Sequence, residues 1–590
     1  MNGRFYTKER NVQIVLFLLK SYGIRRIIAS PGMQNATFVA SVQQDSYFEV
    51  YSSVDERSAA YIACGMAAES GEPVVLSCTG ATAPRNYYSG LTEAFYRKLP
   101  IIAITATKHP SLTGHLVPQA TDRTSRPKDL VVRSEHIQFI ENMNDEWDVT
   151  LKVNNALHSL YKNGGGPIHL NLETHHLTDF SVKELPPVKV IKFIDLNSDI
   201  IDIPKGRVAI FIGAHLPMSD ALEKSIDNFC AAYDAVVFCD HTSNYKGRYR
   251  VFYSLLGAQT NYKSQLFQVD LLIHIGEISG AYDLWCSIKP NQVWRISEDG
   301  VSRDTFKKLS AVFEMKEEVF FTKYSKESLD VSSDSYLKAC HNEYLDTLAK
   351  FPDIPFSNMW IAKQITSKIP EYSVLHLAIL NTLRCWNFFD VPSSVKVFSN
   401  TGGFGIDGII STLIGAALIN PNKIYFGIVG DLAFFYDLNS IGNRHVGKNV
   451  RILLVNNGRG VEFRNPYHFC TPFGKDADPF MAAAGHYGNQ SKNLIRHFAT
   501  DLGYEYMTAS NKEEFNLNVE RFLTPNVTNC PMIFEVFTTV ENEQQALTTA
   551  HSILCNSKQV VKQQVKELVS SACPQGLKKD IKNILNKIKN

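Results

Sequence analysis

The sequence predicts an α/β protein built from three layered domains with mostly parallel sheets. Short apolar runs rich in β-branched residues predict buried strands, and segments with helical spacing separate them. In the clearest case, a helix-like segment joins two such runs, 423–430 and 450–457. This pattern is a βαβ unit, in which the carboxyl ends of both strands meet at one edge of the sheet.

The same alternation of strands and helices divides the chain into domains. It continues from the first residue to a proline-bearing stretch that resembles a linker, and two further α/β units follow. The predicted domains are 1–185, 186–350 and 351–545, and 546–590 is a lysine-rich helical tail. The tail is expected to pack an apolar face on its own protein, with an anionic membrane or a partner as the alternative. That face consists of Leu577, Ile581, Ile584, Leu585 and Ile588.

Composition excludes several classes of protein. Of the 590 residues, 44% are hydrophobic and 20% charged, and the net charge of +1 gives no long-range attraction to nucleic acid or membrane. No run approaches the roughly 18 to 20 apolar residues of a transmembrane helix. The eleven cysteines include no C-x-x-C pair, which favours a reducing compartment, and we expect a cytoplasmic protein.

Two polar positions mark the edge of the predicted βαβ unit. Asp431 follows the first strand, and Asn457 follows the second. Together with a nearby backbone carbonyl, these side chains make an oxygen-only half-cage that suits Mg²⁺, whose other positions would go to water and the phosphates of a ligand. The glycine-rich segment 402–408 lets the backbone approach such a ligand, and the helix after it offers N–H groups to anionic oxygens.

The same glycine segment permits a rival interpretation. Gly403, Gly405 and Gly408 have the G-x-G-x-x-G spacing of a dinucleotide site, with Asp431 further along the chain as the acidic residue. An oxidoreductase is therefore an alternative. It leaves the pairing of Asp431 with the two asparagines at the end of the second strand unexplained.

Several segments resemble a known family. "GDLAFFYDLN" from Gly430, followed by the asparagine pair, resembles the diphosphate-binding motif of thiamine diphosphate enzymes. "SPG" at 30–32, "DERSAAYIACGMA" from Asp55, "CTGATAPRN" from Cys78 and "QATDR" from Gln119 resemble segments of the 2-succinyl-5-enolpyruvyl-6-hydroxy-3-cyclohexene-1-carboxylate (SEPHCHC) synthase family in order and spacing. The resemblance spans about residues 10 to 545. It implies a thiamine diphosphate-binding fold with a pyrimidine-binding domain first and a diphosphate-binding domain last, and a homodimer or homotetramer with the cofactor at the subunit interface.

The resemblance also implies roles for individual residues. Asp431, Asn457 and the main-chain carbonyl of Arg459 become ligands of Mg²⁺. Glu56 becomes the carboxyl group that meets N1′ of the aminopyrimidine, which requires a dry pocket. Two further catalytic positions are Ile406, which would hold the cofactor bent, and Gln119, whose amide would face the reaction centre. The other cofactor-binding positions are Pro31, Gly32, Thr79, Asn86, Gly405, Asp407, Gly430, Leu432 and Ala433.

The substrate pocket departs from the family pattern. Arginines that pair with substrate carboxylates in the family are replaced, and each such loss costs on the order of 2 to 5 kcal/mol in binding. We therefore expect a rebuilt pocket, more aromatic and less basic, in which Glu462 could move protons or repel anionic acceptors. The replaced positions are Gln34, Lys108, Trp386 and Thr401, while a central Lys-Arg pair falls on Ala281 and Tyr282. The other pocket candidates are His109, His115, Asn381, Thr382, Arg384, Glu462 and Phe463.

The sequence thus predicts a thiamine diphosphate- and Mg²⁺-dependent enzyme that acts on a 2-oxo acid donor. It would decarboxylate the donor and pass the acyl unit to an unidentified acceptor, which is the reaction type that the resemblance favours. The alternatives are an authentic SEPHCHC synthase with a divergent pocket, a simple 2-oxo acid decarboxylase that releases an aldehyde, and a catalytically silent scaffold.

Overall fold

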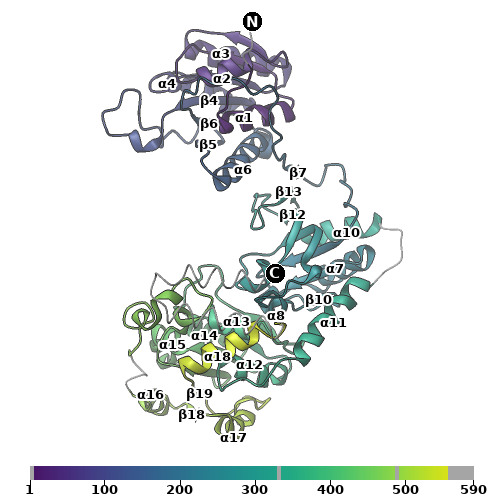
Figure 1. The fold of residues 1–590 in the computed structure, drawn as a ribbon, viewed down its shortest axis with the longest axis vertical. Helices are drawn as coiled ribbons and strands as arrows, with labels where there is room; N and C mark the ends of the chain where they lie inside the picture. Colours follow the sequence, from purple (N-terminus) through teal and green to yellow (C-terminus); the bar gives the residue numbers. More distant parts are fainter. Residues whose placement is uncertain (1–4, 328–333, 486–490, 556–590) are drawn as a thin grey trace, which may run out of the picture. The chain divides into compact units, whose positions relative to one another are not determined.

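The computed structural model describes residues 5–327, 334–485 and 491–555. The chain divides into two compact units (Figure 1). Unit 1 comprises Met1–Asp199 and Asp299–Glu314, and unit 2 comprises Ile200–Glu298 and Met315–Asn590. The domain boundaries predicted at 185 and 350 stay predictions. The predicted apolar face of the tail, from Leu577 to Ile588, lies outside the described residues.

Unit 1 is built around a six-stranded parallel sheet in the order β2-β1-β3-β4-β6-β5. Its strands are buried on both faces, as the apolar runs predict, because α1 and α6 cover one face and α3 and α5 cover the other. The strands are β1 Arg26–Ala29, β2 Glu49–Ser52, β3 Val74–Cys78, β4 Ile101–Thr107, β5 Arg133–Ile137 and β6 Ile168–Glu173. The helices are α1 Arg10–Ser21, α2 Ala36–Val42, α3 Glu56–Ser70, α4 Ala83–Asn86, α5 Tyr88–Arg97 and α6 Met143–Ser159. A separate parallel pair is formed by β7 Lys192–Ile194 and β13 Leu309–Glu314.

Unit 2 contains a first parallel sheet in the order β10-β9-β8-β11-β12. Its strands are β8 Val208–Ile212, β9 Val236–Cys239, β10 Arg250–Val251, β11 Gln268–Ile275 and β12 Lys289–Ser297. The helices of this part are α7 Asp220–Tyr233, α8 Ser254–Gly257, α9 Tyr282–Trp285, α10 Glu317–Glu327 and α11 Ser335–Ala349.

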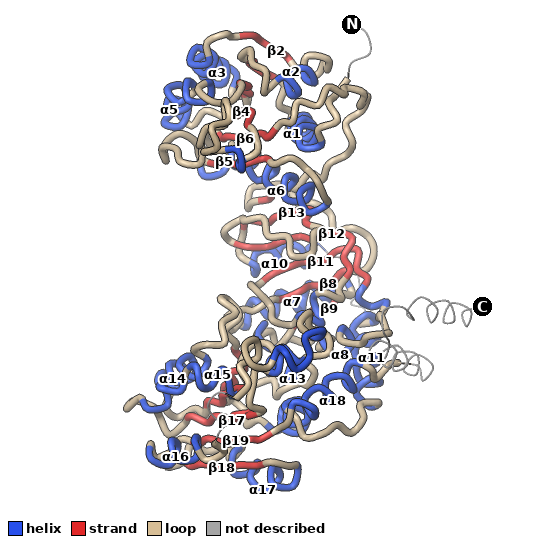
Figure 2. The backbone as a smooth tube through the Cα atoms, turned by 60° about the vertical axis from the view of Figure 1, so that its left-hand side comes forward, coloured by secondary structure: helices blue, strands red, loops and turns tan. Residues whose placement is uncertain are grey.

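The second sheet of unit 2 is also parallel, in the order β15-β14-β16-β17-β19-β18. One hydrophobic cluster joins its first face to α12, α13, α17 and α18, and another joins the opposite face to α14, α15 and α16. Figure 2 shows strands enclosed by helices and loops in both units. The strands are β14 Val374–Leu377, β15 Lys396–Phe398, β16 Tyr425–Gly430, β17 Val450–Asn456, β18 Glu505–Ala509 and β19 Met532–Phe537. The helices are α12 Asn358–Ile365, α13 Asn381–Trp386, α14 Ile409–Ile419, α15 Asp431–Tyr436, α16 Leu494–Asp501, α17 Lys512–Phe522 and α18 Val540–His551.

The predicted α/β class with mostly parallel sheets is confirmed. Every strand pairing given above is parallel, and helices pack through hydrophobic clusters on both faces of the two six-stranded sheets. Among the described residues, no helix is both long and apolar enough to cross a membrane.

Candidate active site

The βαβ edge predicted from the sequence is present in unit 2. Strands β16 and β17 are parallel neighbours, with Gly430 opposite Val455, so both end at the same edge of the sheet. Asp431 then begins α15, and Asn457 is the first residue after β17. The chain therefore brings the carboxyl group and the carboxamide to one place.

A cavity of about 100 Å³ lies at this edge. This volume is small compared with the roughly 300 to 1,000 Å³ of pockets that enclose a whole ligand. Unit 2 by itself thus offers room for part of a cofactor, such as its diphosphate and a cation. The predicted residues that line the cavity are Asn381, Thr382, Ile406, Gly430, Asp431, Leu432, Ala433, Asn457, Arg459, Glu462 and Phe463.

The polar atoms of this cavity fit a divalent cation. Asp431 is 5% exposed, and its burial raises the pKa of its carboxyl group to about 7, although N–H groups of Leu432 and Gly458 lower it. The Oδ1 atom of Asn457 is buried and has no hydrogen-bond partner among the described residues. A cation would offset both the buried charge and the unpaired oxygen.

The donor set also restricts the kind of metal site. Among the described residues, no group of three or more His, Cys, Asp or Glu side chains could hold a metal ion. A cation at this edge would therefore use one carboxylate, one carboxamide and main-chain or ligand oxygens. Hard ions such as Mg²⁺ prefer such oxygen-only sites with few protein ligands.

The glycine-rich segment before α14 lies beside the same cavity. Ile406 lines the cavity and packs against the hydrophobic cluster of α14 and α15. A Cβ atom on Gly405 would come within 2.3 Å of the Asp407 carboxylate, so the backbone and this side chain are in close contact. Gly408 has a φ of +113° and precedes α14, a conformation that favours glycine.

In unit 1, Glu56 is the first residue of α3. Asp55 caps this helix by accepting a hydrogen bond from the N–H of Arg57. The predicted cofactor residue Asn86 donates from Nδ2 to Oε2 of Glu56 over 3.0 Å. Glu56 is only partly buried, so unit 1 alone does not form the dry pocket expected around this carboxyl group.

Two glutamines predicted at the site also meet in unit 1. Gln34 donates from Nε2 to Oε1 of Gln119 over 2.8 Å, and Gln119 adopts a left-handed backbone with φ of +62°. The N–H of Gln34 donates to Oγ1 of Thr79. A Cβ atom on Gly32 would lie 2.3 Å from Cβ of Thr79, so a glycine is required at this close approach.

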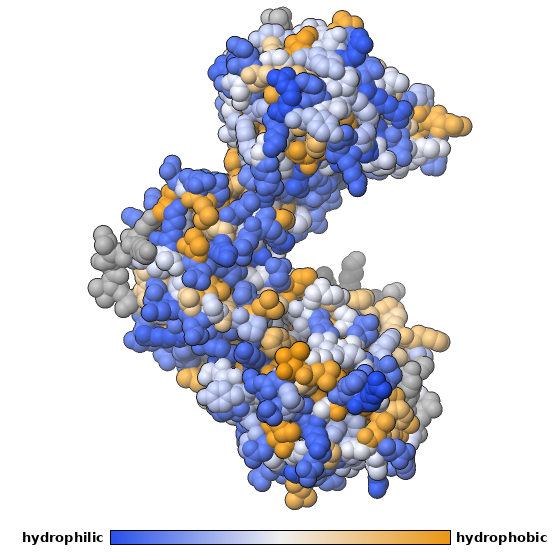
Figure 3. Space-filling model, turned by 180° about the vertical axis from the view of Figure 1, so that it is seen from behind, coloured by the Kyte–Doolittle hydropathy of each residue, from blue (hydrophilic) through white to orange (hydrophobic). Residues whose placement is uncertain are grey.

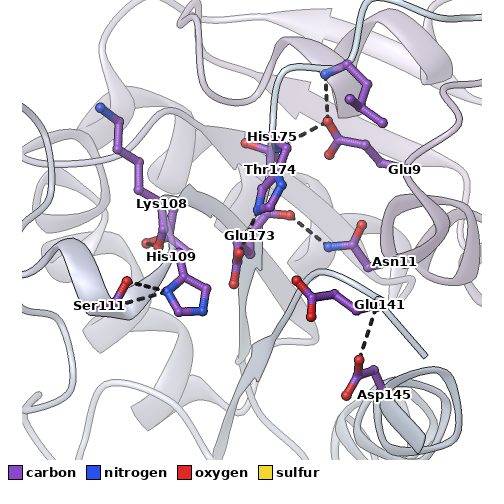
Figure 4. A network of polar contacts seen from close by, with 12 residues as sticks. Glu9, Asn11, Lys108, His109, Ser111, Glu141, Asp145, Glu173, Thr174 and His175 are labelled. Atoms are coloured by element: carbon purple, nitrogen blue, oxygen red, sulfur yellow. Dashed lines mark hydrogen bonds and ion pairs between the residues drawn. The ribbon is translucent and has the colours of Figure 1, made fainter. Parts of the chain in front are cut away.

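The lysine and histidines after β4 are more exposed. Lys108 donates from Nζ to the carbonyl of Pro118 over 2.9 Å, and Nδ1 of His109 lies 2.7 Å from Oγ of Ser111. Figure 4 shows the side chains of Lys108 and His109 pointing in opposite directions. His115 is exposed. Their predicted participation in substrate binding stays a prediction.

Two pocket candidates on α13 and the loop after β17 form an ion pair. Arg384 donates from Nη1 and Nη2 to the two carboxylate oxygens of Glu462, over 2.7 and 2.9 Å. Both side chains are about 15% exposed. The negative charge of Glu462, expected to be available for proton movement or repulsion, is therefore paired with a bidentate cation.

Trp386 does not make the pocket more aromatic, contrary to the expectation. Its side chain is fully buried in the hydrophobic cluster of α12 and α13, where Nε1 donates to Oδ1 of Asn358. Thr401 is 5% exposed and does not line the cavity. Helical spacing explains the first result, because Trp386 and Leu383 lie on the same buried face of α13.

Sequence reasoning missed a buried acid next to the cavity. Glu543 accepts hydrogen bonds from the N–H of Asn358 over 2.9 Å and from Oγ1 of Thr538 over 2.8 Å. Asn358 lines the cavity, and burial raises the pKa of Glu543 to about 7. The available signal was periodicity, because Glu543 shares the apolar face of α18 with Val540 and Leu547.

Comparison with known proteins identifies relatives of this chain. Residues 10–125 match the family described as thiamine pyrophosphate enzyme, N-terminal TPP binding domain. The SEPHCHC synthase of Bacteroides thetaiotaomicron is 29% identical over 559 residues, covering 92% of this chain and 98% of that protein. The SEPHCHC synthase of Phocaeicola vulgatus is 28% identical over 570 residues, covering 94% of this chain and 100% of that protein. Among solved structures, the thiamine diphosphate-dependent 4-hydroxybenzoylformate decarboxylase of Rhodococcus jostii RHA1 covers 90% of this chain and 99% of its own, with 14% identity and a TM-score of 0.39.

These matches relate the chain to thiamine diphosphate-dependent enzymes. Within that class it is related, along most of its length, to proteins named SEPHCHC synthase. The resemblance predicted from the motifs is confirmed.

Proposed function

We propose that this chain uses thiamine diphosphate and Mg²⁺ to decarboxylate a 2-oxo acid and to join the remaining acyl unit to an acceptor. The observation that carries the proposal is the cavity edge where the buried carboxyl group of Asp431 and the unpaired Oδ1 atom of Asn457 meet. Both groups lack a positive partner among the described residues, and a diphosphate-bound cation supplies one.

Each part of the site has a role that follows from its chemistry. Asp431, Asn457 and the carbonyl of Arg459 would hold the cation, and Ile406 would position the cofactor from the cavity wall. When bound, thiamine diphosphate supplies a nucleophilic carbon and an electron sink for decarboxylation. Glu56, which Asn86 orients, would hold a proton next to the cofactor ring, and this requires burial by a further surface.

The pocket is proposed to be less basic than that of the relatives. Gln34 is paired with Gln119, and Arg384 is occupied by Glu462, so two of the polar positions present neutral groups rather than free cations. Thr401 and Trp386 contribute no charge. A donor with a single carboxylate fits this arrangement better than one with several.

Assembly into a homodimer or homotetramer is part of the proposal. Apolar side chains are exposed on both units, as Figure 3 shows from one side. On α3, the helix that begins with Glu56, Tyr61 and Ile62 are 49% and 46% exposed, and on α14 Leu418 and Ile419 are 51% and 85% exposed. A second copy that covers α3 would provide the burial that Glu56 needs.

A reducing compartment such as the cytoplasm is proposed from the thiols. The described cysteines are free, and seven of them, from Cys64 to Cys470, are buried. Buried thiols that form no disulfide are typical of proteins that do not meet oxidising conditions.

The first experiment measures CO₂ release from a panel of 2-oxo acids, including pyruvate and 2-oxoglutarate. Purified protein with thiamine diphosphate and Mg²⁺ is compared with Glu56→Gln. We expect release that depends on both cofactors and on Glu56. Release without added cofactor, or equal release by Glu56→Gln, contradicts the proposed chemistry.

One alternative rests on a specific finding, the relationship to SEPHCHC synthases. An authentic SEPHCHC synthase would use 2-oxoglutarate as the donor and isochorismate as the acceptor. CO₂ release from 2-oxoglutarate in the same panel would favour this alternative and refute the less basic pocket. Analysis of the organic product separates a carboligase from a simple decarboxylase, which releases an aldehyde.

A further inference from the structure

Unit 1 contains a second cavity, of about 480 Å³, beside β5 and β6 and the end of β4. The register of these strands places polar residues side by side, with Asn171 opposite both Thr105 and His136. His169 is next to Ser134, and its Nε2 lies 2.7 Å from Oγ1 of Thr105 while its Nδ1 lies 2.8 Å from Oγ of Ser134. The lining residues are Thr107, Lys108, Pro110, Thr113, Thr121, Asp122, Arg123, Thr124, Arg126, Ser134, His136, His169 and Asn171.

The fixed charges of this cavity are mainly positive. Three cations, Lys108, Arg123 and Arg126, line it, against the single carboxylate of Asp122. Asp122 accepts hydrogen bonds from the N–H and Oγ1 of Thr124 in its own loop. None of the three cations forms an ion pair among the residues that the structure describes.

Arg123 is the most buried of these cations. It donates from Nη1 to Oγ1 of Thr105 over 3.1 Å and from Nη2 to the carbonyl of Ala106 over 2.9 Å. Its Nε atom is buried without a hydrogen-bond partner among the described residues, and burial lowers the pKa of its guanidinium. A desolvated guanidinium bound only to neutral oxygens is unfavourable, and an anion in the cavity would offset that cost.

Glu173, a buried carboxylate at the end of β6, contacts two histidines. Oε1 of Glu173 lies 2.8 Å from Nε2 of His175, and its Oε2 lies 3.6 Å from Nε2 of His136. Figure 4 shows Glu173 and His175 facing each other. Glu173 therefore contacts histidines rather than Arg123 or Arg126.

The cavity lies next to the two glutamines of the predicted site. Arg123 donates to the carbonyl of Ala106, and a Cβ atom on Gly80 would lie 3.2 Å from that carbonyl and 2.2 Å from Oε1 of Gln34. Of the residues predicted from the sequence, only Lys108 lines this cavity. None of the proposed cofactor residues lines it.

We propose that this cavity binds a small dianion with carboxylate or phosphate groups, held by Arg123, Arg126 and Lys108. Guanidinium groups match the oxygen pairs of both kinds of anion, and Ser134, Asn171 and His136 offer further polar contacts at the strand ends. The inference goes beyond the proposed function, because it concerns binding to unit 1 and needs no turnover.

Calorimetric titration of the full-length protein tests this proposal. Succinate and inorganic phosphate are titrated separately at low ionic strength, with thiamine diphosphate and Mg²⁺ at saturation so that the proposed diphosphate site is filled. We expect wild-type protein to bind at least one probe, and Arg126→Gln to weaken that binding by roughly ten- to a hundredfold. Binding of succinate alone identifies a carboxylate ligand, and binding of phosphate alone identifies a phosphate ligand.

Lys128→Gln is the matched control, because Lys128 is exposed in the same loop and does not line the cavity. It removes the same charge and should bind as the wild type does. Arg126 is exposed, so its substitution should leave the fold intact, and circular dichroism checks this. Lys108→Gln is the second variant.

Binding of neither probe by the wild type, or equal binding by Arg126→Gln, overturns the proposal. If the protein does not bind thiamine diphosphate, the proposed function fails, and the same titration without cofactor still tests this site.

Discussion

The two predicted halves of the cofactor site differ in how complete each is within its own unit. In unit 2, the proposed cation ligands lie together at one cavity, and Asp431 is 5% exposed. In unit 1, Glu56 and Asn86 form their hydrogen bond at a surface where Glu56 remains partly exposed. The half in unit 2 is preformed. The half in unit 1 has its residues in place, but no further surface of the described part of that unit buries them.

This difference follows from what surrounds each carboxyl group. Asp431 follows β16, a strand inside the sheet, and is the first residue of α15. Its carboxyl group is therefore surrounded by α15, by the neighbouring strand β17 and by the loop after β17. Glu56 begins α3, a helix whose outer face carries exposed Tyr61 and Ile62. The fold of unit 2 therefore buries the proposed cation ligand Asp431 by itself, whereas burial of Glu56 requires a surface outside unit 1. The predictions below test this division.

The largest effect is expected from Glu56→Gln. The substitution removes the proton-holding group but keeps a side chain that Asn86 can still contact, so turnover should fall by roughly 10²- to 10⁴-fold. Binding of thiamine diphosphate with Mg²⁺ should change little, because the proposed cation site lies in unit 2. Steady-state CO₂ release and calorimetry measure the two quantities. Glu69→Gln, an exposed position at the other end of α3, should behave as the wild type does.

Asp431→Ala, unlike Glu56→Gln, should weaken the binding of thiamine diphosphate itself. Loss of the carboxylate proposed as a cation ligand should weaken binding of thiamine diphosphate on the order of a hundred- to a thousandfold, and excess Mg²⁺ should restore it only in part. Calorimetry over a range of Mg²⁺ concentrations measures this. Asp501→Ala, an exposed residue at the end of α16, is the control. Wild-type affinity in Asp431→Ala would refute the cation assignment and with it the idea of a preformed half.

The preformed half was also the more predictable from sequence. Parallel strands with an acid after one and an amide after the next require only the geometry of a βαβ unit to bring Asp431 and Asn457 together. The α/β class followed from the same apolar runs. The contact between Gln34 and Gln119 was not predictable in this way, since it depends on a long loop in which Gln119 has a left-handed backbone.

The side chains around the cavities were harder to predict for a physical reason. Trp386 was assigned to the pocket by its position in a motif, but the helical face on which it lies is buried in the core. Glu462 was expected as a free acid, and its partner Arg384 lies on a different element. Arg123 and Arg126 became notable only when the fold placed them at a cavity beside β5 and β6. Such pairings depend on tertiary contacts that no local pattern encodes.

The ion pair beside the preformed cavity provides a smaller effect. Arg384→Gln leaves the carboxyl group of Glu462 without its cation and removes one of two positive charges that attract the half-buried Asp283, so we expect a loss of about 3 kcal/mol in stability. Glu462→Gln should cost less, because Asp283 remains near Arg384. The double variant should be more stable than the sum of the two single losses implies. Urea or thermal unfolding of the four proteins measures this coupling, and strictly additive losses would show that the pair does not act as a unit.

Glu543 is buried next to the same cavity, and its predicted effect on stability appears only at higher pH. Burial raises the pKa of Glu543 from 4.5 to about 7, so the unfolded chain ionises this group at a lower pH than the folded chain does. The folded state therefore loses stability as the pH rises from about 4.5 to about 7. Glu543→Gln cannot ionise and should be more stable than the wild type at pH 8, by up to roughly 3 kcal/mol, with the difference shrinking toward pH 5. Thermal unfolding at both pH values measures it beside Glu541→Gln, an exposed neighbour on α18 that should show no such pH dependence. Equal destabilisation by Glu543→Gln at both pH values would mean that its hydrogen bonds to Asn358 and Thr538 outweigh its burial, and that unit 2 tolerates an ionised acid next to the cavity.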